Sequence, residues 1–284
     1  MSRSTTRKVA VLGLGIVGSR VHARLVAAGW DAACWNRTPK NMPGERSAPE
    51  EAVAHADVIS IYLKDSPAVR GVMERVANHL RPEHVVLNHS TLDLATTTWL
   101  HELCMGRGCR FIDAPFTGSR QAAEDGKLVF YIGGDENHAA ELEDYLAVSS
   151  RKRLPCGPVG SATVVKLATN LISACTVQAM AEALAIATRH GVPAEQLAGA
   201  VAENASGSPL AAMKFPAMIG GDYGTHFSLA NMAKDSRYML DLAQQAGVTV
   251  PGIDAVSQRM HELCEDGHGD LDYSVLAKPY FEEP

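Results

Sequence analysis

Hydrophobic and polar positions follow one repeating order through about the first 155 residues: a short apolar, β-branched run and then a longer helix-like stretch. The apolar runs predict strands at Lys8–Gly13, Asp31–Trp35, Val58–Leu63, Val85–Asn88, Arg110–Asp113 and Leu128–Gly133. The stretches between them predict helices at Ile16–Ala28, Pro49–His55, Pro67–His79, Leu94–Met105 and Glu136–Leu146. Strands that alternate with helices are typical of an α/β domain with a doubly wound, mostly parallel sheet and helices on both faces.

The pattern changes after Pro155-Cys156-Gly157-Pro158. Residues 161–190 contain no Gly or Pro and only three firm charges, which predicts a helix about 45 Å long. A helix with so little charge must be covered on most of its circumference, by the first domain, by its own domain and by a second subunit. Further helices are predicted at Ala194–Asn204, Leu229–Ala246 and Ile253–Glu265. We therefore expect domains 1–159 and 160–284, the second all-helical and joined to the first by the long interdomain helix.

A glycine motif follows the first predicted strand. Gly13-Leu14-Gly15-Ile16-Val17-Gly18 is a G-x-G-x-x-G sequence between a strand and a helix. In this context Gly13 permits a tight turn, Gly15 lets the backbone approach a pyrophosphate, and Gly18 lets the helix lie close to the strand. The free N–H groups of the helix N-terminus then face the phosphates. The motif predicts a Rossmann-type dinucleotide-binding domain; the alternative is a purely structural glycine turn.

The residues after the second strand bear on the choice of cofactor. An NAD site normally has Asp or Glu there, which accepts hydrogen bonds from the ribose hydroxyls. Here the position is Asn36, followed by Arg37 and Thr38. These side chains can donate to a 2′-phosphate, and Arg binds phosphate bidentately. The sequence favours NADPH, with NAD as the alternative and a solvated surface charge as the simplest interpretation of Arg37.

With these residues in view, the chain resembles the β-hydroxyacid dehydrogenase family, which includes 3-hydroxyisobutyrate dehydrogenases and glyoxylate/succinic semialdehyde reductases. The glycine motif looks like the family's N-terminal signature, with Val17 in place of the usual Met. The sequence from Asp113 to Ser119 resembles the substrate loop, usually D-A-P-V-S-G-G. The segment Gly157–Gly160 with Lys166 and Asn170 resembles the catalytic segment, and Lys234-Asp235 resembles a late K-D pair. The Thr117-Gly118-Ser119 form looks closer to the semialdehyde reductase branch.

The resemblance implies roles for these positions. Lys166 would be the general acid or base of a hydride transfer, since charge develops on the carbonyl oxygen and must be met by a proton. Asn170, four residues later, shares its helix face. The implied substrate-binding residues are Thr117, Gly118, Ser119, Asn170 and Phe227. The implied remaining cofactor contacts are Leu63, Ser90, Thr91 and Lys234. Asn88 and His89 depart from the family pattern, and a structural role is the favoured interpretation of His89.

Composition limits the other classes. The chain has 284 residues, 46% hydrophobic and 20% charged, and a net charge of −6 without a basic run, so it lacks the footprint of a nucleic-acid binder. Its most apolar segment, between Lys166 and Glu182, has 15 uncharged residues, several of them polar, against about 20 for a membrane span. No signal-peptide pattern precedes the first strand. The six cysteines form no C-x-x-C pair, so we expect reduced thiols and no metal site. The expectation is a cytoplasmic protein that binds neither nucleic acid nor membrane.

The resemblance implies an NADP-dependent enzyme that acts on a small carboxylate-bearing aldehyde, 2-oxo acid or hydroxy acid, as a homodimer or homotetramer. Three alternatives stay open. A 6-phosphogluconate dehydrogenase would have His where Thr169 stands, and imine reductases typically carry Asp or Tyr in place of Lys166. A non-catalytic cofactor-binding protein on the same fold would have no need of Lys166 and Asn170 together. The sequence does not identify the substrate.

Overall fold

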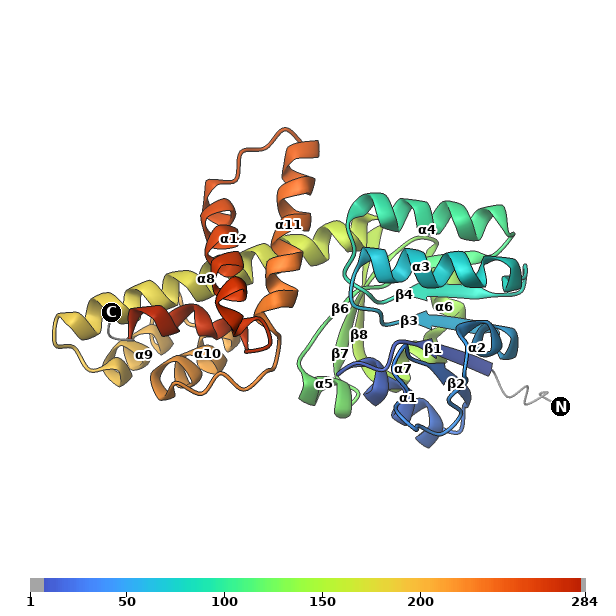
Figure 1. Cartoon of the computed structure of the whole chain (residues 1–284), viewed down its shortest axis with the longest axis horizontal. Helices are drawn as coiled ribbons and strands as arrows, with labels where there is room; N and C mark the ends of the chain where they lie inside the picture. Colours follow the sequence, from blue (N-terminus) through green and yellow to red (C-terminus); the bar gives the residue numbers. More distant parts are fainter. Residues whose placement is uncertain (1–7, 282–284) are drawn as a thin grey trace. The chain divides into compact units, whose positions relative to one another are not determined.

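The computed structural model describes residues 8–281. These residues form two compact units, one that ends at Lys166 and one that begins at Leu167 (Figure 1). The first is a parallel-rich sheet with helices and the second is helical, so the expected fold class is confirmed. The boundary expected from the sequence follows residue 159, whereas contacts group residues 160–166 with the sheet.

The sheet of the first unit has a parallel part and an antiparallel addition. Its parallel strands are β1 (Lys8–Leu12), β2 (Asp31–Trp35), β3 (Val58–Ile61), β4 (Val85–Asn88) and β5 (Arg110–Asp113). Three more strands are β6 (Phe116–Thr117), β7 (Leu128–Gly133) and β8 (Ser150–Gly157). Strand β7 runs antiparallel to β5 and β6 and parallel to β8, and the order is β2-β1-β3-β4-β5-β7-β6 with β8 beside β7.

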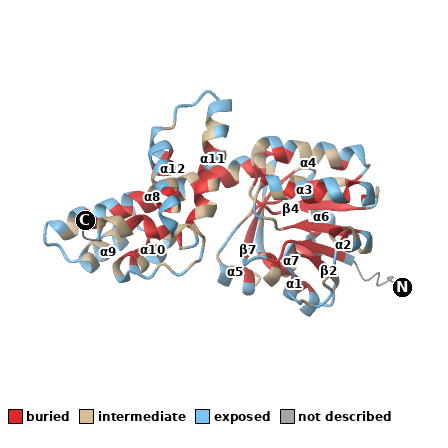
Figure 2. Cartoon of the chain, in the orientation of Figure 1, coloured by how far each residue is buried: buried red, intermediate tan, exposed pale blue. Residues whose placement is uncertain are grey.

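Helices cover both faces of this sheet, so its central strands are buried on both sides (Figure 2). The helical segments of the first unit are α1 (Gly18–Ala27), α2 (Pro49–His55), α3 (Ser66–Val76), the 3₁₀ turn η1 (Ala77–His79), α4 (Leu94–Gly106), α5 (Arg120–Glu124), α6 (Glu136–Glu141) and α7 (Glu143–Ser149). One core joins α2, α3 and α4 to the strand face that contains Leu12, and the other joins α1 and α7 to the face that contains Val11. The alternation of side chains along each strand supplies both cores.

The second unit is built on the long helix α8 (Ser161–Arg189), which starts in the first unit. It also contains α9 (Ala194–Ala202), α10 (Pro209–Gly220), α11 (Leu229–Gln245), α12 (Pro251–Leu263), the π-helical turn η2 (Cys264–His268) and the 3₁₀ segment η3 (Tyr273–Tyr280). One apolar core includes side chains from all of these helices and from η3, among them Leu184, Phe215 and Met260. The sequence predicts α8 within one residue of its observed end.

Helix α8 corrects one expectation. By length and composition alone it could cross a membrane, because an 18-residue window reaches a mean hydropathy of 1.5. The prediction that no segment is long and apolar enough is therefore wrong for α8: Thr169, Asn170 and Ser173 interrupt the apolar sequence without lowering its mean below that of a span. A core helix has the same composition, and α8 supplies Ala174, Val177 and other residues to the core of the second unit.

Candidate active site

The glycine turn between β1 and α1 has the shape that a dinucleotide requires. Gly13 has φ +102°, and a Cβ there would collide with the main-chain oxygen of Tyr62. A Cβ on Gly18 would collide with the oxygen of Gly13, so helix and strand lie as close as glycine permits. At Gly15 no atom lies within 4 Å of the Cβ position. The turn is thus closed on the protein side and open where a pyrophosphate would approach, which fits a dinucleotide.

The rest of the turn leads into α1. Leu14 is buried, Ile16 is 46% exposed, and Val17 is the residue before the helix. No side chain caps α1 there. The Ser19 and Arg20 N–H groups of its first turn donate to the main-chain oxygens of Gly15 and Val17, at 3.2 and 3.0 Å.

Asn36 connects the glycine turn to the next loop. Its Oδ1 accepts a hydrogen bond from the Leu14 N–H at 2.9 Å, and its Nδ2 donates to the Thr38 carbonyl at 2.7 Å. Arg37 and Thr38 are exposed on the same loop. The Glu45 carboxylate accepts from the main-chain N–H groups that follow them. Asn36 therefore connects this loop to the glycine turn, and Arg37 and Lys40 are exposed cations on the loop.

The ends of β3 and β4 bring two further predicted cofactor residues together. The Leu63 N–H donates to the Ser90 hydroxyl oxygen at 2.9 Å. Asn88 accepts from the Ser90 N–H at 3.1 Å and donates to the Ser90 carbonyl at 3.0 Å. Thr91 follows, half-buried. These residues lie with the glycine turn at the carboxyl ends of the parallel strands, where ligands of such sheets bind.

His89 is fully buried rather than presented to a ligand. Its ring stacks on Tyr62 with centroids 4.6 Å apart, and its Nδ1 donates to the Ala114 carbonyl at 2.7 Å. Burial lowers the pKa of His89 to about 4, so the ring is neutral. His89 ties the segment of Ser90 to the start of the substrate loop, a structural role.

The predicted substrate loop lies after β5. Thr117 and Gly118 are exposed, and Gly118 has φ +140°, a conformation that favours glycine. The Ser119 hydroxyl accepts from the Ala122 N–H at 3.2 Å and so caps α5. The Asp113 carboxylate, which begins the motif, is fully buried and accepts from the Thr163 N–H at 2.9 Å. The motif alone assigned Asp113 no role of its own.

In α8 the catalytic candidate Lys166 is 9% exposed and Asn170 is 7% exposed. The Asn170 Nδ2 donates to Asp235 Oδ2 at 2.7 Å, and Lys234 Nζ lies 3.0 Å from Asp235 Oδ1. Asp235, 1% exposed, therefore holds Asn170 and Lys234 in one cluster. The K-D pair pointed to this residue, but no local pattern indicates that its carboxylate meets Asn170.

A second buried carboxylate fixes Phe227. Asp272 accepts from the Phe227 N–H at 3.0 Å and pairs with Lys214 Nζ at 2.6 Å. The Phe227 ring meets Tyr273 edge-on, with centroids 6.0 Å apart. Lys214 and Asp272 were not expected from the sequence, because no local pattern marks either of them.

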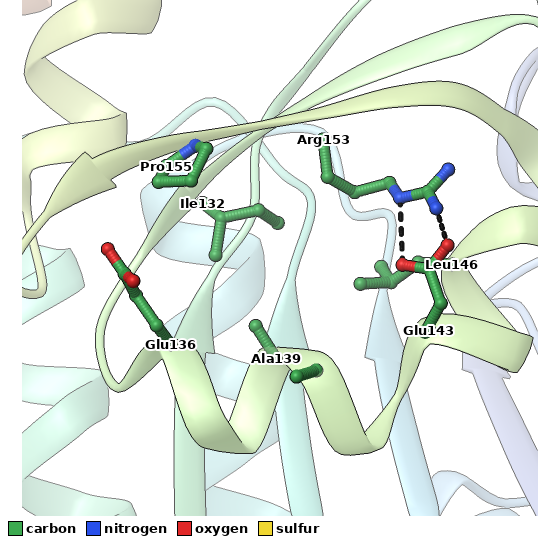
Figure 3. A pocket seen from close by; sticks show the side chains of 8 residues that line it. Ile132, Glu136, Ala139, Glu143, Leu146, Arg153 and Pro155 are labelled. Atoms are coloured by element: carbon green, nitrogen blue, oxygen red, sulfur yellow. Dashed lines mark hydrogen bonds and ion pairs between the residues drawn. The ribbon is translucent and has the colours of Figure 1, made fainter.

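A pocket of about 210 Å³ lies elsewhere in the first unit, between β7, β8 and helices α6 and α7 (Figure 3). Its lining includes Ile132, Leu146 and the Arg153 guanidinium, whose Nε donates to the Glu143 carboxylate at 3.1 Å. None of the predicted site residues lines it, and its cation already has a partner. The pocket is separate from the glycine turn.

Comparison with known proteins decides the family. The family model described as the NAD binding domain of 6-phosphogluconate dehydrogenase matches residues 8–157, and that described as NAD-binding of NADP-dependent 3-hydroxyisobutyrate dehydrogenase matches residues 160–280. The chain belongs to the β-hydroxyacid dehydrogenase family. As a member of the β-hydroxyacid dehydrogenase family it is an NAD(P)-dependent oxidoreductase, and the resemblance seen in the motifs is confirmed.

Similar proteins span nearly all of the chain. Glyoxylate/succinic semialdehyde reductase 2, chloroplastic, from Arabidopsis thaliana is 28% identical over 95% of this chain and 78% of its own length. The solved structure of Mycobacterium tuberculosis 3-hydroxyisobutyrate dehydrogenase with L-serine has a TM-score of 0.90 and 26% identity, over 98% of this chain and 100% of that one. The Streptomyces aurantiacus imine reductase has a TM-score of 0.66 and 19% identity, over 97% of this chain and 100% of that one. This likeness shows a shared fold.

Proposed function

We propose that this chain is an NADP-dependent reductase of small carboxylate-bearing aldehydes or 2-oxo acids, with Lys166 as the general acid. The observation that carries the proposal is the burial of Lys166 and Asn170 four residues apart on α8, with Asn170 held by Asp235. Residues four apart share a helix face, so amine and amide meet one ligand. A structural lysine at such a position needs no oriented amide beside it.

The chain's residues divide the work. Bound NADPH supplies the hydride. Lys166 donates a proton to the carbonyl oxygen as negative charge develops there, and in the reverse direction its amine accepts the hydroxyl proton. Lysine suits both directions because its protonation is tuned by its surroundings, whereas arginine stays protonated. Asp235 fixes the orientation of the Asn170 amide, which positions the substrate.

The substrate class rests on the loop after β5. The exposed Thr117 hydroxyl and the Gly118 backbone are donors suited to a carboxylate. The names of the relatives point the same way: glyoxylate, succinic semialdehyde, 3-hydroxyisobutyrate and L-serine are all small carboxylates. The imine reductase alternative has only the shared fold in its favour, and Lys166 stands where those enzymes typically carry Asp or Tyr.

The test is a set of initial rates with glyoxylate, succinic semialdehyde, methylmalonate semialdehyde and tartronate semialdehyde, each with NADPH and with NADH. We expect one of the four to be reduced, faster with NADPH. Lys166→Ala should keep NADPH binding and lose at least the ~10²-fold that general acid catalysis supplies. Lys166→Arg should not restore the rate. A kcat of Lys166→Ala close to that of the parent would exclude Lys166 as the acid.

A further inference from the structure

Helix α8 begins without a capping side chain of its own. The residue before it is Gly160, with φ +91°. Glycine has no side chain, so this residue cannot accept from the N–H groups of the first turn. The acceptor comes from a strand 50 positions earlier: Asp113 Oδ2 accepts from the Thr163 N–H at 2.9 Å. The Thr163 hydroxyl donates to the same carboxylate, at 3.0 Å from Oδ1 and 2.9 Å from Oδ2. Asp113 therefore caps α8 from β5.

The contact ties together two segments of the proposed site. Asp113 is the last residue of β5, and the chain continues from it through Ala114 to the loop of Thr117. Thr163 lies three residues before Lys166 in α8, which places the two on neighbouring positions of one helix face. One buried carboxylate thus joins the start of the substrate loop to the turn that carries the lysine. All of these residues belong to the first unit.

A buried carboxylate is a costly helix cap, because burial disfavours its ionised form. Asp113 is 0% exposed, and burial raises the pKa of its carboxyl to about 6, so the ionised form is disfavoured there. A serine or asparagine next to the helix would satisfy the same N–H without a buried charge. A carboxylate differs from these caps because its two oxygens accept hydrogen bonds from both the N–H and the hydroxyl of Thr163. These bonds fix the position and the rotation of the first turn of α8.

We propose that Asp113 is a positioning residue that fixes the position of Lys166 relative to the substrate loop. It acts through Thr163 and the first turn of α8 and touches neither substrate nor cofactor. The Thr97 hydroxyl of α4 lies 3.0 Å from the Thr163 hydroxyl and gives Thr163 a second contact. The inference rests on the proposed role of Lys166 in catalysis.

The test compares two carboxylate–threonine caps in one protein. Asp93 caps α4 in the same way, accepting from the Thr96 N–H at 2.7 Å and from the Thr96 hydroxyl at 3.0 Å. Helix α4 carries no predicted catalytic, substrate or cofactor residue, and Thr97, which contacts Thr163, is kept in both variants. Asp113→Asn and Asp93→Asn are therefore matched variants. For Asp113→Asn we expect kcat to fall roughly ten- to hundred-fold, the scale of a misplaced catalytic group, with KM and the Kd for NADPH little changed. For Asp93→Asn we expect kcat to be retained.

Thr163 provides a second pair should Asp113→Asn fold poorly. Thr163→Val removes the hydroxyl bond and keeps the N–H bond, whereas Thr163→Ser keeps both, so Val should lower kcat and Ser should restore it. Amide hydrogen exchange of residues 161–166 should be faster in Asp113→Asn and in Thr163→Val.

The outcomes separate the two claims. If the parent reduces none of the aldehydes, the proposed function fails, and the inference falls with it. If the parent is active and Lys166→Ala is not, but Asp113→Asn and Thr163→Val keep the parental kcat, the inference alone is overturned. A loss of thermal stability in Asp113→Asn with kcat unchanged also overturns it, because Asp113 would then be a cap and nothing more.

Discussion

At the scale of single residues, Arg37 tests the preference for NADPH. Its side chain is exposed on the loop that Asn36 and Glu45 hold beside the glycine turn. Arg37→Ala should weaken NADPH binding by about 1.5–3 kcal/mol, the scale of hydrogen bonds to a charged group, and leave NADH binding nearly unchanged. Lys40→Ala is the control, since Glu45 holds the main chain of Lys40 whatever its side chain. Fluorescence titration measures both cofactors, and equal losses for the two in Arg37→Ala would contradict the prediction.

Two buried groups give opposite dependences of stability on pH. His89 has a folded-state pKa of about 4, below its ordinary 6.5, so its contribution is present above pH 6.5 and is lost as pH falls towards 4. Asp113 has a folded-state pKa of about 6, above its ordinary 3.8, so its contribution is present below pH 3.8 and is lost as pH rises through 6. Each contribution amounts to roughly 3 kcal/mol, because a tenfold change in a protonation equilibrium corresponds to about 1.4 kcal/mol. The two effects therefore nearly cancel between pH 4 and 6.5.

Variants of each residue should separate the two effects in urea unfolding at pH 4.5 and 7. His89→Asn keeps a donor for the Ala114 carbonyl but does not titrate, so the parent should lose more stability on acidification than this variant. Asp113→Asn should gain stability relative to the parent as pH rises, because the buried charge is gone. Parallel pH curves for parent and variants would show that neither group changes its protonation in this range.

Three contacts of the site could not have been read from the sequence. Asp113–Thr163, Asn170–Asp235 and Lys214–Asp272 join residues 50, 65 and 58 positions apart. The glycine turn was predictable because a strand, three glycines and a helix stand next to one another in the chain. A buried carboxylate whose partner comes from a distant element leaves no local pattern.

At the scale of elements, burial explains which strands were predicted. All six predicted strands are mostly buried and are present: β2, β4, β5 and β7 begin and end at the predicted residues, and β1 and β3 end one and two residues earlier than predicted. Strand β8 was missed, since it pairs only with β7 among the described strands and carries exposed Arg151 and Lys152. Charge on an edge strand is typical, as it discourages pairing with another chain. The two-residue strand β6 is too short for any pattern.

Helices α10 and α5 were not predicted, because a proline interrupts the first and the second is too short to show a helical pattern. Helix α10 contains Pro216, which argues against a helix, although Ser208 and Pro209 are a good N-terminal pair: the Ser208 hydroxyl accepts from the Ala211 N–H at 3.1 Å. Helix α5 has only five residues. The helix predicted over Glu136–Leu146 is two short helices, α6 and α7, that meet at Leu142.

The Lys214–Asp272 pair joins several elements of the second unit. Both side chains are 3% exposed; Lys214 lies in α10, and Asp272 precedes η3 and accepts from the N–H groups of the loop before α11. Lys214→Met leaves a buried carboxylate without its cation, which typically costs about 3–5 kcal/mol of unfolding free energy. Adding Asp272→Asn should recover part of the loss.

The control for that measurement is an exposed ion pair of the same unit. Arg259 and Glu262 are 33% and 60% exposed, so Arg259→Met should change stability by at most ~1 kcal/mol. Urea unfolding of the three variants gives the comparison. A Lys214→Met variant no less stable than Arg259→Met would mean that the buried pair is not what holds these elements together.

At the scale of the whole molecule, one face of α8 indicates an assembly. In the second unit its exposed positions include Ala168, Ile172, Ala179, Ala183 and Ile186, and the two isoleucines are 64% and 63% exposed. Their spacing of three, four or seven residues places them in one stripe along the helix. Small alanines between large isoleucines let a second helix approach closely. We propose that a second copy of this chain covers the stripe.

The assembly prediction is a homodimer, or a dimer of dimers, that buries more than the ~1,200 Å² lower bound of a standard interface. Light scattering at micromolar concentration should give at least twice the 30.3 kDa mass of the chain. Ile172→Glu with Ile186→Glu should shift that mass towards the monomer, because each would bury a charge in the interface. Val248→Glu, at an exposed apolar position outside α8, is the matched control and should leave the mass unchanged.

Since α8 is also apolar enough for a membrane, the same samples should be floated with lipid vesicles. A monomeric parent, or a parent that floats with the vesicles through this stripe, would overturn the dimer, because the face would then have another occupant.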